Sequence, residues 1–288
     1  MDSHHGLVQV PLPPGHRFPM EKYRRTRQLL QEDPQCAEKI LFVPGPQASV
    51  EDLLLVHAPE YIDRFKTAKM TPSEVRNLGL PHSAELVGRS LCSSGSTIAA
   101  THLVLGGKHT MAANMAGGTH HAFRDRGEGF CVCNDISSAA AVAIRDYGLS
   151  RILVVDLDVH QGNGTSSIWE GDRRVVTFDM HGANNYPYSS RMRSTYDIAM
   201  ADGTTDAQCL PLLEKWLDHL VNHHQPQLMF FQAGVDALQG DSLGRLALTR
   251  QGLIRRNNMV YKTCEQASIP LVITMGGGYA KVWNALQQ

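Results

Sequence analysis

Cysteine is scarce in this sequence, and its spacing does not suit a thiolate metal site. The 288-residue chain has six cysteines and no CxxC pair, and the two closest are Cys131 and Cys133. A structural zinc site usually has four ligands with several cysteines among them, so none is predicted. We expect reduced thiols in a cytoplasmic protein and no disulfides.

Long apolar runs and a strong net charge are also missing. No stretch has the roughly 18 consecutive apolar residues of a membrane span, and MDSHHGLVQVPLPPGHRFP lacks the charged-then-apolar layout of a signal peptide. The formal net charge of -1 creates no field that would attract nucleic acid or an anionic membrane. We therefore expect no membrane span and no direct nucleic-acid binding, and the residues carry no signal for an oligomeric state.

Alternating apolar patterns are present and predict the fold class. Short apolar runs over residues 152–158, 174–181, 228–236 and 270–279 are typical of buried parallel strands. Helical patterns cover residues 20–31, 85–105 and 135–148, the last with Asp135 as the predicted N-cap. Because no repeat or long linker interrupts the chain, we expect residues 1–288 to form one α/β domain. Its open, mostly parallel sheet would carry helices on both faces and bind ligands beyond the carboxyl ends of the strands.

One predicted strand ends in charged residues that need an explanation. In RILVVDLDVHQGNGT, strand alternation would place Asp156, Asp158 and His160 on one face. Their desolvation is costly unless something binds them. Asp158 and His160, together with Asp236 after another strand, offer three ligands for a divalent metal and leave a position open for water. A DxD site for phosphates or sugar nucleotides, or a hydrogen-bonded strand end, is equally compatible with this spacing.

A second cluster, GGTHHAFRDRGEGFCVCND, contains the adjacent histidines His120 and His121. Glycines on both sides of this pair permit tight turns and close approach of the backbone to a ligand. An imidazole pair beside a metal can accept a proton from water and donate one to a leaving amine. The other adjacent pairs, at residues 4–5 and 223–224, are interpreted as solvated.

These segments together resemble a known family. The chain is similar to the zinc-dependent histone deacetylases of the arginase-deacetylase fold, and most similar to the class IV branch and its bacterial relatives. The resemblance spans roughly residues 10–283 and rests on PPGHRFPMEKY, GGTHHA, RGEGFCVCND, VVDLDVHQGNGT, QAGVDALQGDSLGRL and GGGY, in the family's order. It implies a zinc ion held by Asp158, His160 and Asp236. It also implies a tandem dyad, His120 and His121, and a hydroxyl, that of Tyr279, facing the substrate carbonyl.

The resemblance extends to residues around this centre. Asp156 is placed to hold His120 in one tautomer, and Asn163, an aspartate in some family members, to hold His121. The implied walls of a narrow acyl channel are Gly129, Phe130 and Tyr186, with Leu243 near the zinc. The implied potassium site comprises Asp156, Asp158, His160, Asp179 and Met180, and Asp179 stands where many members have serine.

The function implied is hydrolysis of the amide bond of N-acyl-lysine by a metal-activated water, with a peptide or protein as the partner. An amidohydrolase for small acylated amines such as acetylpolyamines is an alternative, because NLGLPHSAEL offers no aspartate for gripping a substrate backbone. A non-catalytic acyl-lysine binding protein is a further alternative. Iron(II) is an alternative to zinc for two carboxylates and a histidine. Arginase-like dinuclear manganese hydrolysis would need more carboxylates than these motifs supply.

Overall fold

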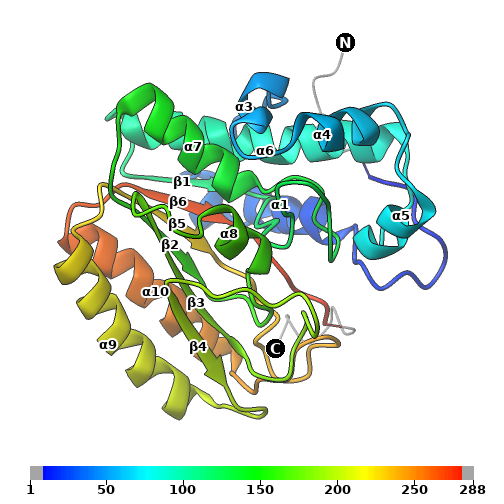
Figure 1. Cartoon of the computed structure of the whole chain (residues 1–288). Coiled ribbons are helices and arrows are strands. Elements are labelled where there is room, and N and C mark those ends of the chain that lie inside the picture. The colour runs from blue at the N-terminus through cyan, green and yellow to red at the C-terminus, as the bar shows by residue number, and fades with distance from the viewer. Residues whose placement is uncertain (1–8, 281–288) are drawn as a thin grey trace.

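Six parallel strands form one sheet in the order β1-β6-β5-β2-β3-β4 (Figure 1). The computed structural model describes residues 9–280 of the chain. The strands are β1 (Met111–Asn114), β2 (Ile152–Asp156), β3 (Val175–Gly182), β4 (Tyr196–Met200), β5 (Leu228–Gln232) and β6 (Leu271–Thr274). The predicted α/β class and the parallel sheet are confirmed.

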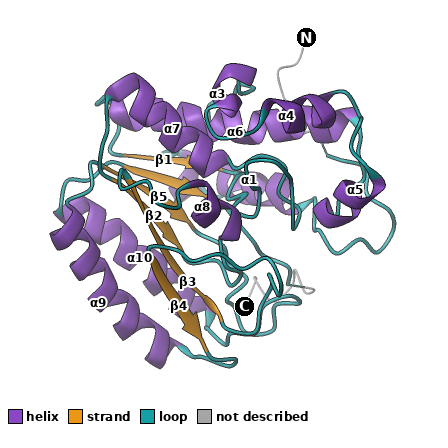
Figure 2. Ribbon diagram, in the orientation of Figure 1, coloured by secondary structure: helices purple, strands orange, loops and turns teal. Residues whose placement is uncertain are grey.

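Helices cover both faces of this sheet, as predicted (Figure 2). Two long helices, α9 and α10, pack on one face, and α1, α6 and α7 lie on the other. The helices are α1 (Lys22–Glu32), α2 (Pro34–Ala37), α3 (Val50–Leu54), α4 (Pro59–Lys66), α5 (Pro72–Leu78), α6 (Ala84–Leu105), α7 (Asp135–Tyr147), α8 (Asn163–Ile168), α9 (Asp206–His224) and α10 (Arg250–Gln266). Within residues 9–280, no helix combines the length and the apolar character that a membrane crossing needs.

The surroundings of the central strand β2 explain why its sequence is a continuous apolar run. Every residue of β2 is buried. Ile152 and Val154 belong to the core under α6 and α7, whereas Leu153 and Val155 belong to the core under α9 and α10. Because alternate side chains enter two different cores, neither face of the strand needs polar residues.

Two edge strands and the helix cap differ from expectation. The sequence analysis missed β1 and β4, which lie at the edges of the sheet, are only partly buried and therefore lack a continuous apolar run. The prediction of Asp135 as the cap of α7 was wrong, because Asn134 caps the helix by accepting a hydrogen bond from the amide of Ser137. Asp135 begins the helix and its carboxylate accepts from the amides of Gly118 and Thr119. All six cysteines are free.

Three of the predicted strands end earlier than expected, and β1, β2, β5 and β6 all end at one level of the sheet. Strand pairing places one polar residue of each strand in a single row across the sheet near its carboxyl edge: Asn114, Thr274, Gln232, Asp156, Asp179 and Asp197. The predicted strands 152–158, 228–236 and 270–279 continue beyond this row as loops. At this level β1, β2, β5 and β6 pass into loops, as expected for a ligand site in this fold class, whereas β3 and β4 continue for three more residues.

Candidate functional site

Loops from the ends of three strands meet at this edge. Asp158 and His160 follow β2, Asp236 follows β5, and Tyr279 follows β6, while residues 117–135 supply the histidine pair. The metal-binding atoms of Asp158, His160 and Asp236 lie within 4.8 Å of one another, and all three residues are buried. The structure thus brings together the three residues that the sequence selected as metal ligands.

The spacing of the DxDxH motif has a different cause from the one predicted. The expected strand alternation was wrong for Asp158 and His160, because β2 ends at Asp156. Instead, Asp156 Oδ1 accepts a hydrogen bond from the amide of Asp158 at 3.1 Å, and Asp158 Oδ1 accepts from the amide of His160 at 3.0 Å. These are successive turns in which an aspartate bonds to the backbone two residues on. The repeat of two therefore comes from turn chemistry.

The other contacts of the two carboxylates fix their orientation. Asp158 Oδ2 accepts hydrogen bonds from Gln232 Nε2 and from the amide of Gly277, both at 2.8 Å. Asp236 Oδ1 accepts from the amide of Val159 at 2.9 Å. Asp158 Oδ1, which also accepts from the amide of His160, and Asp236 Oδ2 are the two oxygens that face the space beside His160 Nδ1.

That space suits a cation. His160 Nδ1 lies 2.9 Å from Asp158 Oδ1 and 3.2 Å from Asp236 Oδ2, and Asp236 Oδ2 is buried without a hydrogen-bond partner. Burial and the charge of Asp158 raise the pKa of Asp236 to about 6. Burial alone would lower the pKa of His160, but the two nearby carboxylates, Asp158 first and then Asp236, raise it to about 10. One nitrogen and two carboxylate oxygens match the ligand preferences of a catalytic zinc or iron(II) site.

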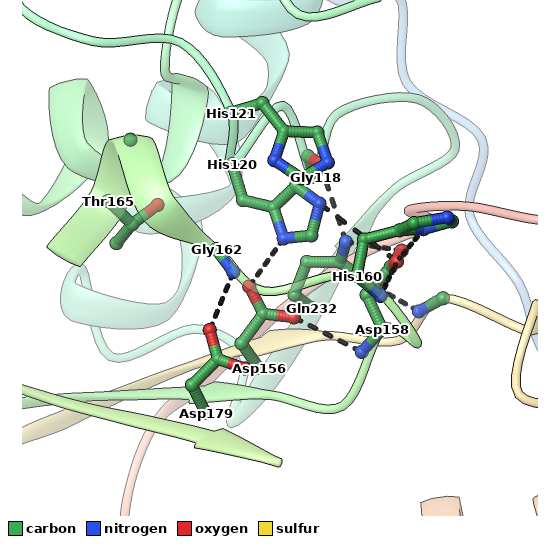
Figure 3. Close-up of polar contacts among 12 residues, drawn as sticks. Gly118, His120, His121, Asp156, Asp158, His160, Gly162, Thr165, Asp179 and Gln232 are labelled. Carbon is green, nitrogen blue, oxygen red and sulfur yellow. Dashed lines mark hydrogen bonds and ion pairs between the residues drawn. The ribbon is translucent and has the colours of Figure 1, made fainter. Parts of the chain in front are cut away.

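The two histidines of the pair are held by different partners, and Figure 3 shows the contact of His120 with Asp156. His120 Nδ1 lies 2.7 Å from Asp156 Oδ2, and His121 Nδ1 lies 2.8 Å from Asn163 Oδ1. The ring centroids are 4.1 Å apart. Because each Nδ1 is engaged, each Nε2 is left for the cavity, as the resemblance implied for these two side-chain pairs.

Electrostatics distinguish the two rings. Burial alone would lower the pKa of His120, but Asp156 and Asp158 reverse this effect and raise it to about 9. Burial, followed by the charges of His120 and His160, lowers the pKa of His121 well below its ordinary value. His121 is therefore the neutral imidazole of the pair near pH 7.

Sequence reasoning missed a buried glutamate behind Asn163. Glu128 Oε1 accepts hydrogen bonds from Asn163 Nδ2 at 3.2 Å, from the Tyr186 hydroxyl at 2.5 Å and from the Ser190 hydroxyl. Gln232, which orients Asp158, was missed as well. Glu128 stands between two glycines in RGEGF, and that charged residue inside a glycine loop was the available signal.

The segment that leads from β6 to Tyr279, residues 275–279 and here called the tyrosine loop, is anchored to the carboxylate of Asp158. In addition to the Gly277 bond to Asp158, Lys22 Nζ donates to the carbonyl of Gly276 at 2.8 Å. The Tyr279 ring stands edge-on to His160 with centroids 6.0 Å apart. Burial raises the pKa of Tyr279 well above its ordinary value, so its hydroxyl stays protonated and able to donate.

A cavity leads to this centre. Its lining includes Gly129, Phe130, both histidines, Asp158 and Tyr279. A Cβ at Gly129 would lie 2.7 Å from the His121 ring, so a glycine is needed for this close approach. Tyr186 stands edge-on to His121 at 4.9 Å, and Leu243 is half-buried. Neither lines this cavity, and their place in an acyl channel stays a prediction.

The predicted potassium site contains one notable charge. Asp179 pairs with Asp156 on the neighbouring strand, and its Oδ2 accepts from the amide of Gly162 at 2.6 Å. Its Oδ1 is buried without a hydrogen-bond partner. Burial and the nearby Asp156 raise the pKa of Asp179 well above its ordinary value. An unsatisfied carboxylate oxygen is compatible with a cation here, and potassium stays a prediction.

Comparisons with known proteins show which proteins this chain is similar to. The histone deacetylase domain matches residues 16–287. Histone deacetylase 2 of Arabidopsis thaliana is 33% identical over 274 residues, covering 92% of this chain and 70% of that protein. A protein of Picosynechococcus described as uncharacterized is 43% identical over 281 residues, covering 96% of this chain and 91% of that protein.

Solved structures are similar in fold. The HDA15 HD domain aligns with a TM-score of 0.82 at 21% identity, over 97% of this chain and 85% of that one. An HDAC homolog complexed with SAHA aligns with a TM-score of 0.80 at 25% identity, over 96% of this chain and 77% of that one.

Gly277 provides a test of how tightly the two carboxylates are packed. A Cβ at this position would lie 1.8 Å from Asp236 Oδ2 and 2.7 Å from Asp158 Oδ2. We expect Gly277→Ala to lower the free energy of unfolding by about 1–3 kcal/mol, because overpacking forces both carboxylates to move. Urea unfolding of the purified protein measures this change.

The matched control is Gly88→Ala inside α6, where a Cβ would meet nothing within 4 Å. That variant should gain about 0.5–1 kcal/mol from helix propensity. Parent-like unfolding of Gly277→Ala would show that the carboxylates are not confined as described.

Proposed function

The chain belongs to the histone deacetylase family, and from that premise we propose that it hydrolyses the amide bond of N-acyl-lysine with a bound zinc ion. One observation carries the proposal: His120, His121, Tyr279 and Asp158 line one cavity, and Asp158 belongs to the buried cluster that it forms with His160 and Asp236. Hydrolysis of an unactivated amide needs an activated water, a proton carrier and a donor to the oxyanion. The buried cluster, the histidine pair and Tyr279 supply one each.

Zinc is the proposed metal, with iron(II) as the alternative that the same ligands allow. When bound, zinc supplies Lewis acidity, which polarises a carbonyl and makes water acidic enough to react near neutral pH. Asp158, His160 and Asp236 would hold it. Gln232 and the Gly277 amide keep Asp158 in the orientation that this requires.

His121 is the proposed proton carrier. Its lowered pKa leaves it neutral, and its bond to Asn163 directs Nε2 toward the cavity. In that state it accepts a proton from the attacking water and later gives it to the departing lysine amine. His120, held by Asp156, would carry positive charge beside the reacting atoms.

Tyr279 is the proposed oxyanion donor. Its phenol stays protonated because burial disfavours the phenolate. The hydroxyl would bond more strongly to the developing oxyanion than to the neutral amide, so it lowers the barrier more than it favours binding.

A second class of substrate is proposed as the alternative to acyl-lysine peptides. Because residues 77–86 contain no aspartate to grip a peptide backbone, small acylated amines such as acetylpolyamines are the alternative substrates. Release of acetate from an acetyl-lysine peptide compared with acetylputrescine separates the two.

A non-catalytic binding role is disfavoured because every proposed catalytic group is present. Class IV membership, a cytoplasmic location and one domain over residues 1–288, including the ends outside the described residues, remain proposals.

Removing either carboxylate ligand should remove the metal. We expect Asp158→Ala and Asp236→Ala each to lose measurable turnover and to fall well below the zinc content of the parent, because two ligands hold the ion much less tightly than three. Elemental analysis of the purified variants measures the metal. Parent-like stoichiometry in both variants would disprove the ligand assignment.

Tyr279→Phe keeps the ring and its packing while removing the donor. We expect turnover of an acetyl-lysine peptide to fall roughly a hundredfold to a thousandfold, as for loss of one oxyanion donor. KM, metal content and unfolding should change little. Steady-state kinetics give both constants, and turnover at the parent rate would mean that Tyr279 has no role in the transition state.

A further inference from the structure

Asp241 is a buried aspartate beside the tyrosine loop. It has no role in the site as described so far. It is 9% exposed. Its Oδ2 accepts a hydrogen bond from the amide of Tyr279 at 2.7 Å, and its Oδ1 accepts from the amides of Leu243 and Gly244 at 2.8 and 3.0 Å. Hydrogen bonds to an ionised acceptor are among the stronger ones in proteins. One carboxylate therefore joins two loops.

The tyrosine loop needs such an anchor. Gly276 and Gly278 have φ angles of 66° and 157°, a region that glycine enters freely and other residues avoid. Glycine also loses more backbone conformational entropy on folding than other residues do. Lys22 and Asp158 fix the start of the loop through Gly276 and Gly277. Asp241 fixes the other end of the loop at Tyr279, whose side chain is the proposed oxyanion donor.

The segment on the other side of Asp241 is itself firmly placed. A Cβ at Gly244 would lie 1.9 Å from the carbonyl oxygen of Asp236, so the segment folds back closely on the metal-ligand loop. Asn185 Nδ2 donates to the carbonyl of Leu243 at 2.7 Å. The carboxylate of Asp241 thus links the backbone of Tyr279 to a closely packed part of the site.

We propose that Asp241 is a positioning residue that holds the backbone of Tyr279 so that its phenol faces the reacting carbonyl. The proposal rests on the proposed function of Tyr279. It predicts that loss of the Asp241–Tyr279 bond lowers turnover through Tyr279, while metal binding and substrate binding are retained. A displacement of about 1 Å at a catalytic group can cost on the order of a hundredfold in rate.

Asp241→Asn isolates this bond. The asparagine oxygen can still accept from Leu243 and Gly244, which places its NH2 group against the N–H of Tyr279, donor against donor. We expect kcat for an acetyl-lysine peptide to fall roughly ten- to a hundredfold, with KM within about twofold and zinc content unchanged. Asp202→Asn is the matched control, since Asp202 is an exposed carboxylate paired with Arg245 near the same loop. It should behave as the parent.

A double-mutant comparison identifies the route of the effect. In the Tyr279→Phe background, Asp241→Asn should lower kcat by less than about twofold, because there is no hydroxyl left to position. Hydrogen exchange at the Tyr279 amide should accelerate in Asp241→Asn, a readout that needs no activity. An equal loss of kcat in both backgrounds, a loss of zinc, or unchanged exchange would overturn the proposal. If the parent protein turns over no acyl-lysine while the exchange result holds, the proposed function fails and the positioning contact stands.

Discussion

Two buried aspartates face each other across the imidazole of His160, and the loops of the site are arranged around them. Asp158 and Asp236 are 1% and 0% exposed, and charges buried to this extent are unfavourable unless they are paired or bind a metal. One oxygen of each is satisfied by the backbone or by Gln232. The remaining oxygens converge on His160 Nδ1, and this arrangement is compatible with a metal ion held by the three residues.

The sheet explains how the chain can place so many polar groups in its interior. The residues in register at its carboxyl edge are polar in all six strands, as the pairing of the strands shows. Below that row, the strands β2 and β5 are apolar and buried at every position before their last residue. The two cores hold the strands in place, and the polar row then orients the loops that carry the site. Asp156 holds His120 from this row, and Gln232 holds Asp158.

Local patterns predicted much of this architecture, and long-range contacts account for what was missed. The apolar runs predicted the buried strands, and the motifs selected the residues that converge on the cavity. The edge strands β1 and β4 have no continuous apolar run, because pairing on one side only leaves them partly exposed. Glu128 and Asp241 act on residues 35 and 38 positions away in the sequence, Asn163 and Tyr279. Such pairings depend on how the loops fold over the sheet, which no local spacing reveals.

We propose that one metal ion between Asp158, His160 and Asp236 enables amide hydrolysis. The most direct test is to remove metal from the full chain with a chelator and then to titrate zinc back. Both bound zinc and the acetate released from an acetyl-lysine peptide are measured during the titration. We predict that release stops without metal and returns in proportion to occupancy, reaching a plateau near one zinc per chain. Acetate release that persists in the metal-free protein would contradict the account, as would a zinc-loaded protein that releases no carboxylate from any acyl-lysine peptide.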